Sequence, residues 1–311
     1  MLTNKQKKEV SKAANMWVAK SKDRSQAKLS DAVGINKAYM SNICKEVFQI
    51  NHAERAPSPI SDKVFYRIAA EIGLQLEFRP HFNSEPHRRI LKACAFTQKM
   101  HRRFIIDSKA SGMTKTYTLE KYAAENENVV YVKCTSLMKG KDLIQLLLDK
   151  LHISFEKRVS NTVKLNAITK KILETPGILI IIDEFENPSM DMLLVVKDIE
   201  DATYQQAGFI LCGMGLIAYL KAASQNNRKL GPQLWRRFRN YTLRLGSYSP
   251  DYTINGLIEH GIENDEVIAW ITDRVQDFGR LSEYVKDIHD HLIIQDKEVT
   301  VKEVESLFKP L

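Results

Sequence analysis

The feature that most constrains the fold of this chain is an alternation of short apolar runs with longer amphipathic stretches. The apolar runs have the length of buried strands and occupy residues 103–107, 129–133, 177–182, 208–212 and 240–245. The amphipathic stretches are typical of helices and occupy residues 88–100, 116–126, 142–151, 163–173 and 192–203. Because alternating strands and helices are joined by right-handed crossovers, the pattern predicts an α/β fold: a mostly parallel sheet with helices on both faces.

The pattern changes at both ends of this region. Residues 1–80 contain short amphipathic stretches without a strand pattern, and residues 251–311 are helical only. Residues 79–86 hold two prolines among polar residues and are expected to link two domains. Residues 56–59, Ala-Pro-Ser-Pro, are predicted to form a loop, because each proline disfavours helix in the residue before it. The sequence therefore predicts a small all-α domain at 1–80, an α/β core at 81–250 and a helical lid at 251–311.

Composition favours an anionic partner and a reducing compartment. Lysine and arginine outnumber aspartate and glutamate by 46 to 38, a net charge of +8, and such a surplus favours a polyanion such as double-stranded DNA. Cys44, Cys94, Cys134 and Cys212 lie far apart, without the spacing of a metal site, so we expect buried thiols. The longest apolar run, 178–182, is too short to span a bilayer and the first residues are polar. We therefore expect a cytoplasmic protein without a membrane partner.

Residues 26–46 have the pattern of two short helices joined by a sharp turn. Leu29, Ala32 and Val33 would share one helix face, and Gly34 falls where the backbone must turn. Asn36 is suited to cap the second helix, whose buried face would hold Met40 and Ile43. This pattern resembles the helix-turn-helix of phage repressors over residues 10–75. That resemblance implies DNA contacts from exposed side chains of the second helix, namely Lys37, Tyr39, Asn42 and Lys45. The alternative is a helical hairpin that contacts proteins.

A degenerate phosphate loop follows the first apolar run of the α/β region. Phosphate loops have the pattern G-x-x-x-x-G-K-[ST] between a strand and a helix, so that backbone N–H groups and the lysine can bind phosphates. Lys115 and Thr116 fit the last two positions, and Gly112 provides a glycine inside the loop. Lys109 and Thr114 occupy the two positions where the pattern requires glycine.

Further along the chain, three features match ATPase motifs. The apolar run 178–182 leads into Asp183 and Glu184, where an aspartate would serve the magnesium shell and a glutamate would polarise water. Arg236 and Arg237 precede the last apolar run, where ring-forming ATPases of the AAA+ type offer an arginine to a neighbour's nucleotide. Arg280 lies in the predicted lid, where such proteins have a second arginine sensor. These arginines also fit simpler roles, a basic surface for the pair and a helix C-terminal cap for Arg280.

Taken together, the helix-turn-helix head, the short linker and the AAA+ body resemble the Mu B transposition protein family over nearly the whole chain. That resemblance implies an ATP-dependent DNA-binding ATPase that self-associates into a helical filament or ring on DNA, delivers target DNA to a transposase and stimulates it. It implies ATP and Mg²⁺ as cofactors. It assigns the phosphates to Lys115, the metal to Thr116 and Asp183, catalysis to Glu184 and the trans-acting finger to Arg237.

The resemblance also implies that basic residues after the second strand and the following helix face DNA. The corresponding residues are Lys139, Lys141, Lys157 and Arg158, which are equally well explained as solvated surface side chains.

Departures from the family pattern leave two other hypotheses open. Thr114 adds a Cβ at the phosphate loop, and Met214 stands where a polar sensor is usual, so we expect weak or slow hydrolysis. ATP binding is expected to survive, with Lys109 adding positive charge. One alternative is a DNA-binding regulator whose ATPase-like body is a nucleotide-dead scaffold for oligomerisation. The other is a loader or initiator ATPase that acts on a replicative helicase.

Overall fold

A computed structural model describes the chain except residues 1, 3, 51–56, 75, 77, 79, 227–230, 296 and 309–311. It divides into two units, each described here by itself. One unit comprises residues 83–252 with 276–279, and the other comprises residues 1–82, 253–275 and 280–311. Among the described residues, no helix is both long and apolar enough to cross a membrane.

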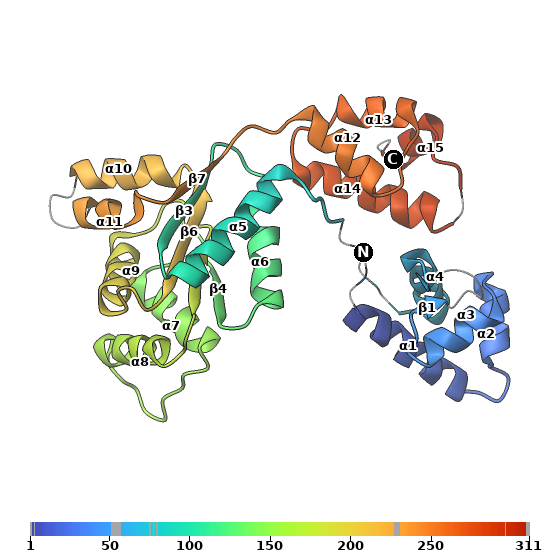
Figure 1. Ribbon diagram of the computed structural model, residues 1–311, viewed down its shortest axis with the longest axis horizontal. Helices are drawn as coiled ribbons and strands as arrows, with labels where there is room; N and C mark the ends of the chain where they lie inside the picture. Colours follow the sequence, from blue (N-terminus) through green and yellow to red (C-terminus); the bar gives the residue numbers. More distant parts are fainter. Residues whose placement is uncertain are drawn as a thin grey trace. The chain divides into compact units, whose positions relative to one another are not determined.

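The first unit is built on a five-stranded parallel sheet, as the sequence predicts (Figure 1). Its strands are β3 (Arg103–Ser108), β4 (Val129–Lys133), β5 (Leu179–Asp183), β6 (Gly208–Met214) and β7 (Thr242–Leu245). The spatial order is β4-β5-β6-β3-β7, so β6 lies between β3 and β5, and β4 and β7 form the edges. This order brings the ends of β3 and β5 close together, although about 70 residues separate the two strands in sequence.

Helices cover both faces of this sheet. They are α5 (Glu85–Met100), α6 (Lys115–Glu125), α7 (Gly140–Lys150), α8 (Asn161–Leu173), α9 (Met190–Ala202), α10 (Leu216–Asn226) and α11 (Gly231–Phe238). Side chains alternate along β5: Leu179 and Ile181 pack with α5 and α6, whereas Ile180 and Ile182 pack with α7 to α11. Every residue of β5 is buried, as expected for a central strand covered on both faces.

The predicted helix boundaries differ from the structure where a cap fixes the start. Helix α5 begins at Glu85 and not at residue 88, because the Ser84 side chain caps it and Pro86 fits the first turn. Helix α7 begins at Gly140, since the Asp142 carboxylate accepts a hydrogen bond from the Lys139 N–H. Ser84 therefore caps a helix that Glu85 and Pro86 begin, although the sequence suggested a linker over these residues.

In the second unit, the N-terminal part contains α1 (Asn4–Ala19), α2 (Gln26–Val33), α3 (Lys37–Cys44) and α4 (Asp62–Ile72). The expectation of helices alone is wrong here, because β1 (Gln49–Ile50) pairs antiparallel with β2 (Ser58–Pro59). Proline is tolerated in this ribbon because both strands are edges and no further strand requires its missing N–H. Residues 51–56, including part of the predicted loop, lie outside the described residues.

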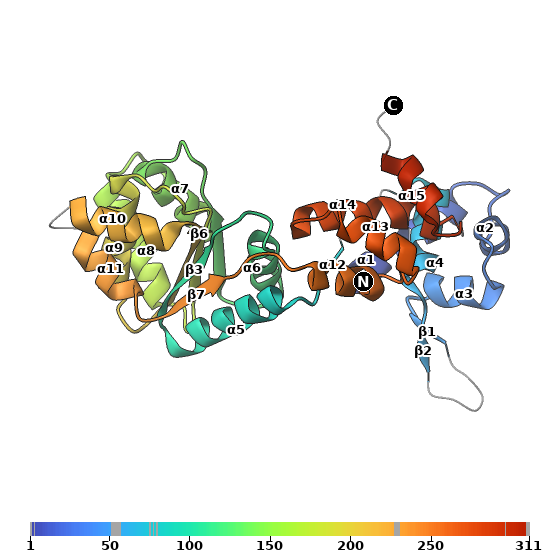
Figure 2. The same cartoon turned by 90° about the horizontal axis from the view of Figure 1, so that it is seen from above.

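The C-terminal part of the second unit is helical, as expected. It contains α13 (Asp265–Thr272), a π-helical turn η1 (His289–Ile293), α15 (Val301–Phe308), and all but the first residues of α12 (Pro250–Glu259) and α14 (Phe278–Ile288), whose starts belong to the first unit (Figure 2). His289 of this part stacks on Phe78, with ring centroids 3.8 Å apart, and meets Tyr66 edge-on at 4.7 Å. The Arg67 side chain donates a hydrogen bond to the Ile294 carbonyl. N-terminal and C-terminal segments therefore pack together within one unit.

Candidate nucleotide site

The candidate site lies at the carboxyl edge of the sheet, where β3, β6 and β5 end side by side. Ser108 ends β3, Met214 ends β6 and Asp183 ends β5. The phosphate-loop segment leaves β3 and enters α6 at Lys115. Parallel α/β sheets bind ligands at this edge, because the loops after the strands converge there.

The Lys115 side chain is held inside this loop. It is 9% exposed, and its ammonium donates a hydrogen bond to the Ser108 hydroxyl over 2.5 Å. Ser108 in turn donates to the carbonyl of Ala110 over 2.8 Å. No carboxylate among the described residues lies within ion-pair distance of this ammonium. The positive charge of Lys115 is therefore not neutralised by the protein, which suits a phosphate ligand.

Thr116 and the two acids at the end of β5 lie together. The Thr116 hydroxyl donates to Glu184 Oε1 over 3.4 Å. Asp183 is completely buried, and its carboxylate accepts hydrogen bonds of 2.9 Å from the Tyr131 hydroxyl and the Glu184 N–H. Burial, and then the Asp183 charge, raise the pKa of Tyr131, so the phenol stays protonated and donates. Glu184 has a φ of 56°, a left-handed conformation that non-glycine residues adopt mostly where the surrounding structure imposes it.

Two residues of the loop have left-handed backbone conformations. Gly112 has a φ of 68°, and a Cβ there would lie 2.6 Å from the Asp277 Cβ, so only glycine fits. The Phe278 N–H donates to the Gly112 carbonyl over 2.9 Å. Thr114 also has a positive φ, 59°, and its buried hydroxyl has no hydrogen-bond partner. Lys109, the other departure from the pattern, is exposed.

Sequence reasoning missed two sets of residues at this edge. Tyr131 was not singled out, because nothing in its strand pattern marks it as a partner of Asp183. Three aromatic rings also pack together beside the loop: Phe278 meets Tyr248 at 5.0 Å and Tyr252 at 5.4 Å between ring centroids. Stacked rings provide the flat apolar surface that a planar heterocycle requires. The spacing of Tyr248 and Tyr252 can be seen in the sequence, but their packing against Phe278 cannot be predicted from it.

Of the two arginines predicted to act on the nucleotide, Arg237 lies at the other edge of the sheet from these acids. Arg237 is in the last turn of α11 and precedes β7, so it lies at the amino edge of the sheet, where it binds Glu200 over 2.7 Å and also pairs with Asp201. Within one chain it is not part of the nucleotide site, and a role toward a neighbouring copy stays a prediction. Arg280 belongs to the other unit, where it pairs with Glu283 over 2.8 Å.

The predicted DNA-binding residues are on the surface. Lys37 and Lys45 of the α3 region are exposed, and Tyr39 and Asn42 are half-buried. The local geometry agrees with the prediction, since Gly34 has a φ of 69° and the Asn36 side chain caps α3 through the Ala38 N–H. One detail is wrong: Ala32 is exposed, and Ser30 occupies the buried face of α2, where its hydroxyl bonds the Ala27 carbonyl. The other four basic candidates are exposed residues around α7 and the segment after it: Lys139, Lys141, Lys157 and Arg158.

Comparisons with known proteins agree with this architecture. Residues 98–218, less than half of the chain, match the family model described as AAA domain. The structure of Cdc6p from Pyrobaculum aerophilum is similar, with a TM-score of 0.54 and 15% identity over 69% of this chain and 62% of that one. The Orc1 protein from Aeropyrum pernix, solved in complex with DNA, has a TM-score of 0.52 and 13% identity over 75% of this chain and 65% of that one.

The matched part therefore spans less than two thirds of either solved chain. A comparison with curated protein sequences gave no significant match. The expected AAA+ fold is confirmed: a five-stranded parallel sheet with helices before and after it. The finer resemblance to the Mu B family stays a prediction. The match to the AAA domain model is confined to residues 98–218, inside a chain with the AAA+ fold.

Proposed function

We propose that this protein is an ATP-dependent DNA-binding AAA+ protein that assembles on double-stranded DNA, delivers that DNA to a transposase and stimulates it. The observation that carries the ATP-dependent part is the convergence of Lys115, Thr116, Asp183 and Glu184 at one edge of the sheet. These four side chains come from two segments far apart in sequence. A protein without a nucleotide has no chemical need for all four together.

The residues at this edge fit a magnesium-bound nucleotide. Lys115 would bind the terminal phosphates, and Thr116 and Asp183 would hold the ion directly or through water. Magnesium sites in proteins commonly use few protein oxygens, because phosphate oxygens and water complete the octahedron. Magnesium would neutralise charge that develops on the phosphates, and Glu184 would orient a water molecule.

DNA binding is supported by the local geometry of α2 and α3. The left-handed Gly34 and the cap at Asn36 make the turn that a helix-turn-helix requires, and α3 exposes Lys37 and Lys45. The recognition helix of such motifs contacts base edges and phosphates from these positions. The similar Orc1 structure is a complex with DNA, which accords with this proposal although its similarity concerns the fold. Self-assembly and the transposase partner rest on the Mu B resemblance alone.

A second candidate function has specific support at the phosphate loop. In a nucleotide-dead scaffold, the lysine would be satisfied internally, and Lys115 does bind Ser108. Thr114 occupies a conformation suited to glycine, and the Asp277 side chain packs against the loop at Gly112, where a carboxylate opposes phosphate. In that case the protein would be a DNA-binding regulator whose AAA+ body only mediates oligomerisation.

One experiment separates the two functions. Filament formation and DNA binding are measured with ATP, with ADP and without nucleotide, for the wild type and Lys115→Ala. If ATP promotes DNA-coating assemblies and Lys115→Ala abolishes that effect, the ATP-dependent function stands. Lys170→Ala is the matched control, because it removes an exposed lysine from α8, a helix that contributes none of the four side chains at the nucleotide site. Equal binding in every condition would refute the ATP-dependent function and support the scaffold.

The transposase part needs its own assay. DNA strand transfer by a candidate partner transposase is measured with and without the wild type and Lys115→Ala. Stimulation by the wild type with ATP supports the proposal. No stimulation by a protein that binds DNA and ATP would refute this part and leave the rest standing.

A further inference from the structure

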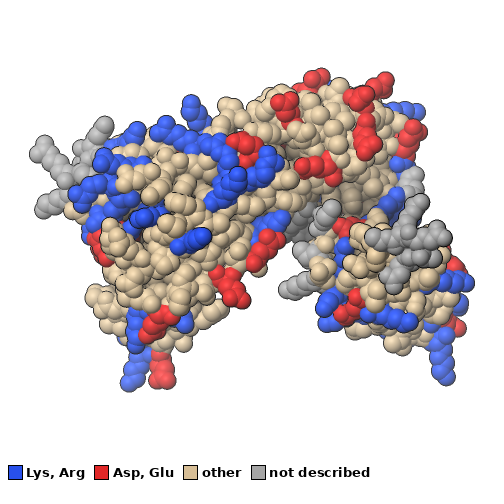
Figure 3. Space-filling model, in the orientation of Figure 1, with Lys and Arg blue, Asp and Glu red and all other residues tan. Residues whose placement is uncertain are grey.

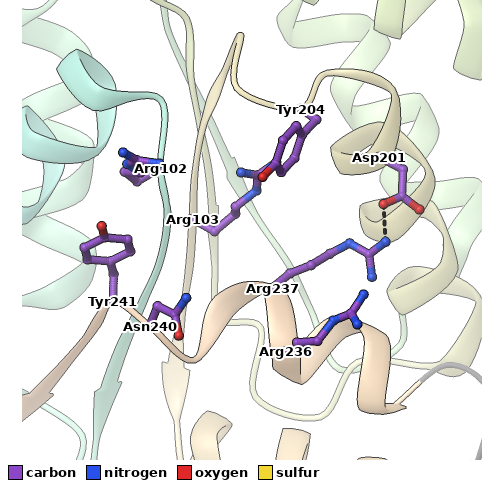
Figure 4. Close-up of a pocket in the computed structure, with 8 residues that line it drawn as sticks. All are labelled: Arg102, Arg103, Asp201, Tyr204, Arg236, Arg237, Asn240 and Tyr241. Atoms are coloured by element: carbon purple, nitrogen blue, oxygen red, sulfur yellow. Dashed lines mark hydrogen bonds and ion pairs between the residues drawn. The ribbon is translucent and has the colours of Figure 1, made fainter.

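A second basic site lies in the AAA+ unit, at the amino edge of the sheet and therefore opposite the nucleotide site. A cavity of about 430 Å³ opens there between the start of β3, the end of α9 and the end of α11. Four arginines line it, together with one acid and two tyrosines (Figure 4). Arg102 and Arg103 come from the start of β3, and Arg236 and Arg237 come from the last turn of α11.

Two of the four arginines are fixed by ion pairs with a buried acid, Glu200, and an exposed one, Asp201. Glu200 is completely buried, and it pairs with both Arg103 and Arg237. Burial raises the pKa of Glu200, while the two guanidinium groups oppose that effect. Arg237 also pairs with Asp201, where hydrogen bonds from Lys197 and Arg237 outweigh burial and lower the pKa. These ion pairs hold the wall of the cavity in place, and the acids neutralise the positive charges of Arg103 and Arg237.

The other two arginines keep their charge. Among the described residues, the guanidinium groups of Arg102 and Arg236 have no hydrogen-bond or ion-pair partner. Arg102 is half-buried, and its Nε atom has no acceptor. Arg236 is exposed on the α11 side of the same cavity, next to Arg237 and across from Arg102 (Figure 4). Each guanidinium group can donate two parallel hydrogen bonds to the oxygens of one phosphate group.

The positive charge continues beyond the cavity. Exposed basic residues follow on the elements next to it: Lys99 in the last turn of α5, Arg239 after α11 and Arg244 on the edge strand β7. Figure 3 shows lysine and arginine side chains spread over the face where Figure 1 has α10, α11, β7 and α5. A free phosphate ion would need only the cavity, whereas a strip of basic residues suits a polymer with regularly spaced phosphates.

From these observations we infer that this face of the AAA+ unit is a second DNA-binding site, in which Arg102 and Arg236 each contact a backbone phosphate of double-stranded DNA. The inference rests on the proposed DNA-binding function and assigns part of it to the AAA+ unit. It differs from the predicted head contacts on α3 and from the residues near α7. Arg103 and Arg237 are positioning residues here, because they fix the wall and already bind acids.

The test uses the full chain and measures affinity for double-stranded DNA of random sequence as a function of salt. The variant is R102A/R236A, and the matched control is K170A/K171A, which removes two exposed charges from the last turn of α8. Each lost phosphate contact lowers the slope of log K against log salt by about 0.9. We expect R102A/R236A to lose one to two such contacts and about tenfold in affinity, whereas K170A/K171A stays near the wild type. R102K/R236K keeps the charge but loses the paired geometry, and it should fall in between.

The contribution of the helix-turn-helix to DNA binding is separated from that of the AAA+ unit by repeating the assay with K37A/K45A. If K37A/K45A keeps salt-dependent DNA binding that R102A/R236A then removes, the second site is supported. If K37A/K45A abolishes binding alone, or R102A/R236A behaves like its control, the inference is overturned while the proposed DNA-binding function stands. If R102A/R236A instead lowers ATP hydrolysis in a concentration-dependent way and leaves DNA affinity unchanged, the cavity serves a second copy's nucleotide and the inference is equally overturned. Absence of DNA binding by the wild type would refute both proposals.

Discussion

Replacing Thr114 by glycine should stabilise this protein, although the substitution removes a side chain. Thr114 has φ 59° and ψ 5°, and a left-handed backbone costs a non-glycine residue about 1–2 kcal/mol. Its hydroxyl is buried without a partner, and an unsatisfied buried polar group costs about 1–3 kcal/mol. Glycine removes both penalties but loses about 0.5–1 kcal/mol through its freedom in the unfolded chain. We therefore expect Thr114→Gly to raise the free energy of unfolding by about 1–4 kcal/mol.

The assay is urea unfolding followed by circular dichroism, with Thr114→Ala as the control. Alanine removes the hydroxyl and keeps the backbone strain, so its stability should fall between those of threonine and glycine. ATP affinity, measured by titration calorimetry, should rise in Thr114→Gly because no Cβ then stands where the loop closes on phosphate. The reasoning is refuted if glycine is no more stable than threonine, or if alanine is more stable than glycine.

Three other substitutions test the structure elsewhere. Glu200→Ala leaves Arg103 and Arg237 without their buried partner and should lower the free energy of unfolding, measured in urea, by about 3–5 kcal/mol. The double variant Arg103→Met with Glu200→Leu should recover most of that loss. Equal losses in the two variants would contradict a buried ion pair. Burial, then the charges of Lys121 and Arg88, lower the pKa of His87 to about 4, so between pH 4 and 6.5 the unfolded chain binds more protons. Stability should therefore fall by about 3 kcal/mol as the pH drops through that window, and His87→Gln should flatten the profile. Asn36→Ala removes the cap of α3 and should cost about 1 kcal/mol, with weaker DNA binding; unchanged stability would show that the cap contributes nothing.

The sequence alone determined the elements whose signal is local. Gly34 and Asn36 fixed the turn between α2 and α3, because a left-handed backbone and an N-cap depend on single residues. The apolar run 178–182 identified the central strand, and its end placed Asp183 and Glu184 at the carboxyl edge. Lys115 and Thr116 followed from their position between a strand and a helix. The antiparallel pair of β1 and β2 was not predicted, because a strand of two residues has no detectable periodicity.

Only the tertiary structure decided which distant residues meet. The strand order puts β6 between β3 and β5, and this places Thr116 within hydrogen-bond distance of Glu184. The Tyr131 hydroxyl reaches Asp183 because β4 pairs with β5, and the Phe278 N–H reaches Gly112 from a segment far along the chain. Arg103 and Arg237 meet at Glu200 for the same reason, since the start of β3 and the segment leading into β7 share the amino edge of the sheet. Local patterns specify a strand or a helix, but the neighbours of each strand depend on how the whole core packs.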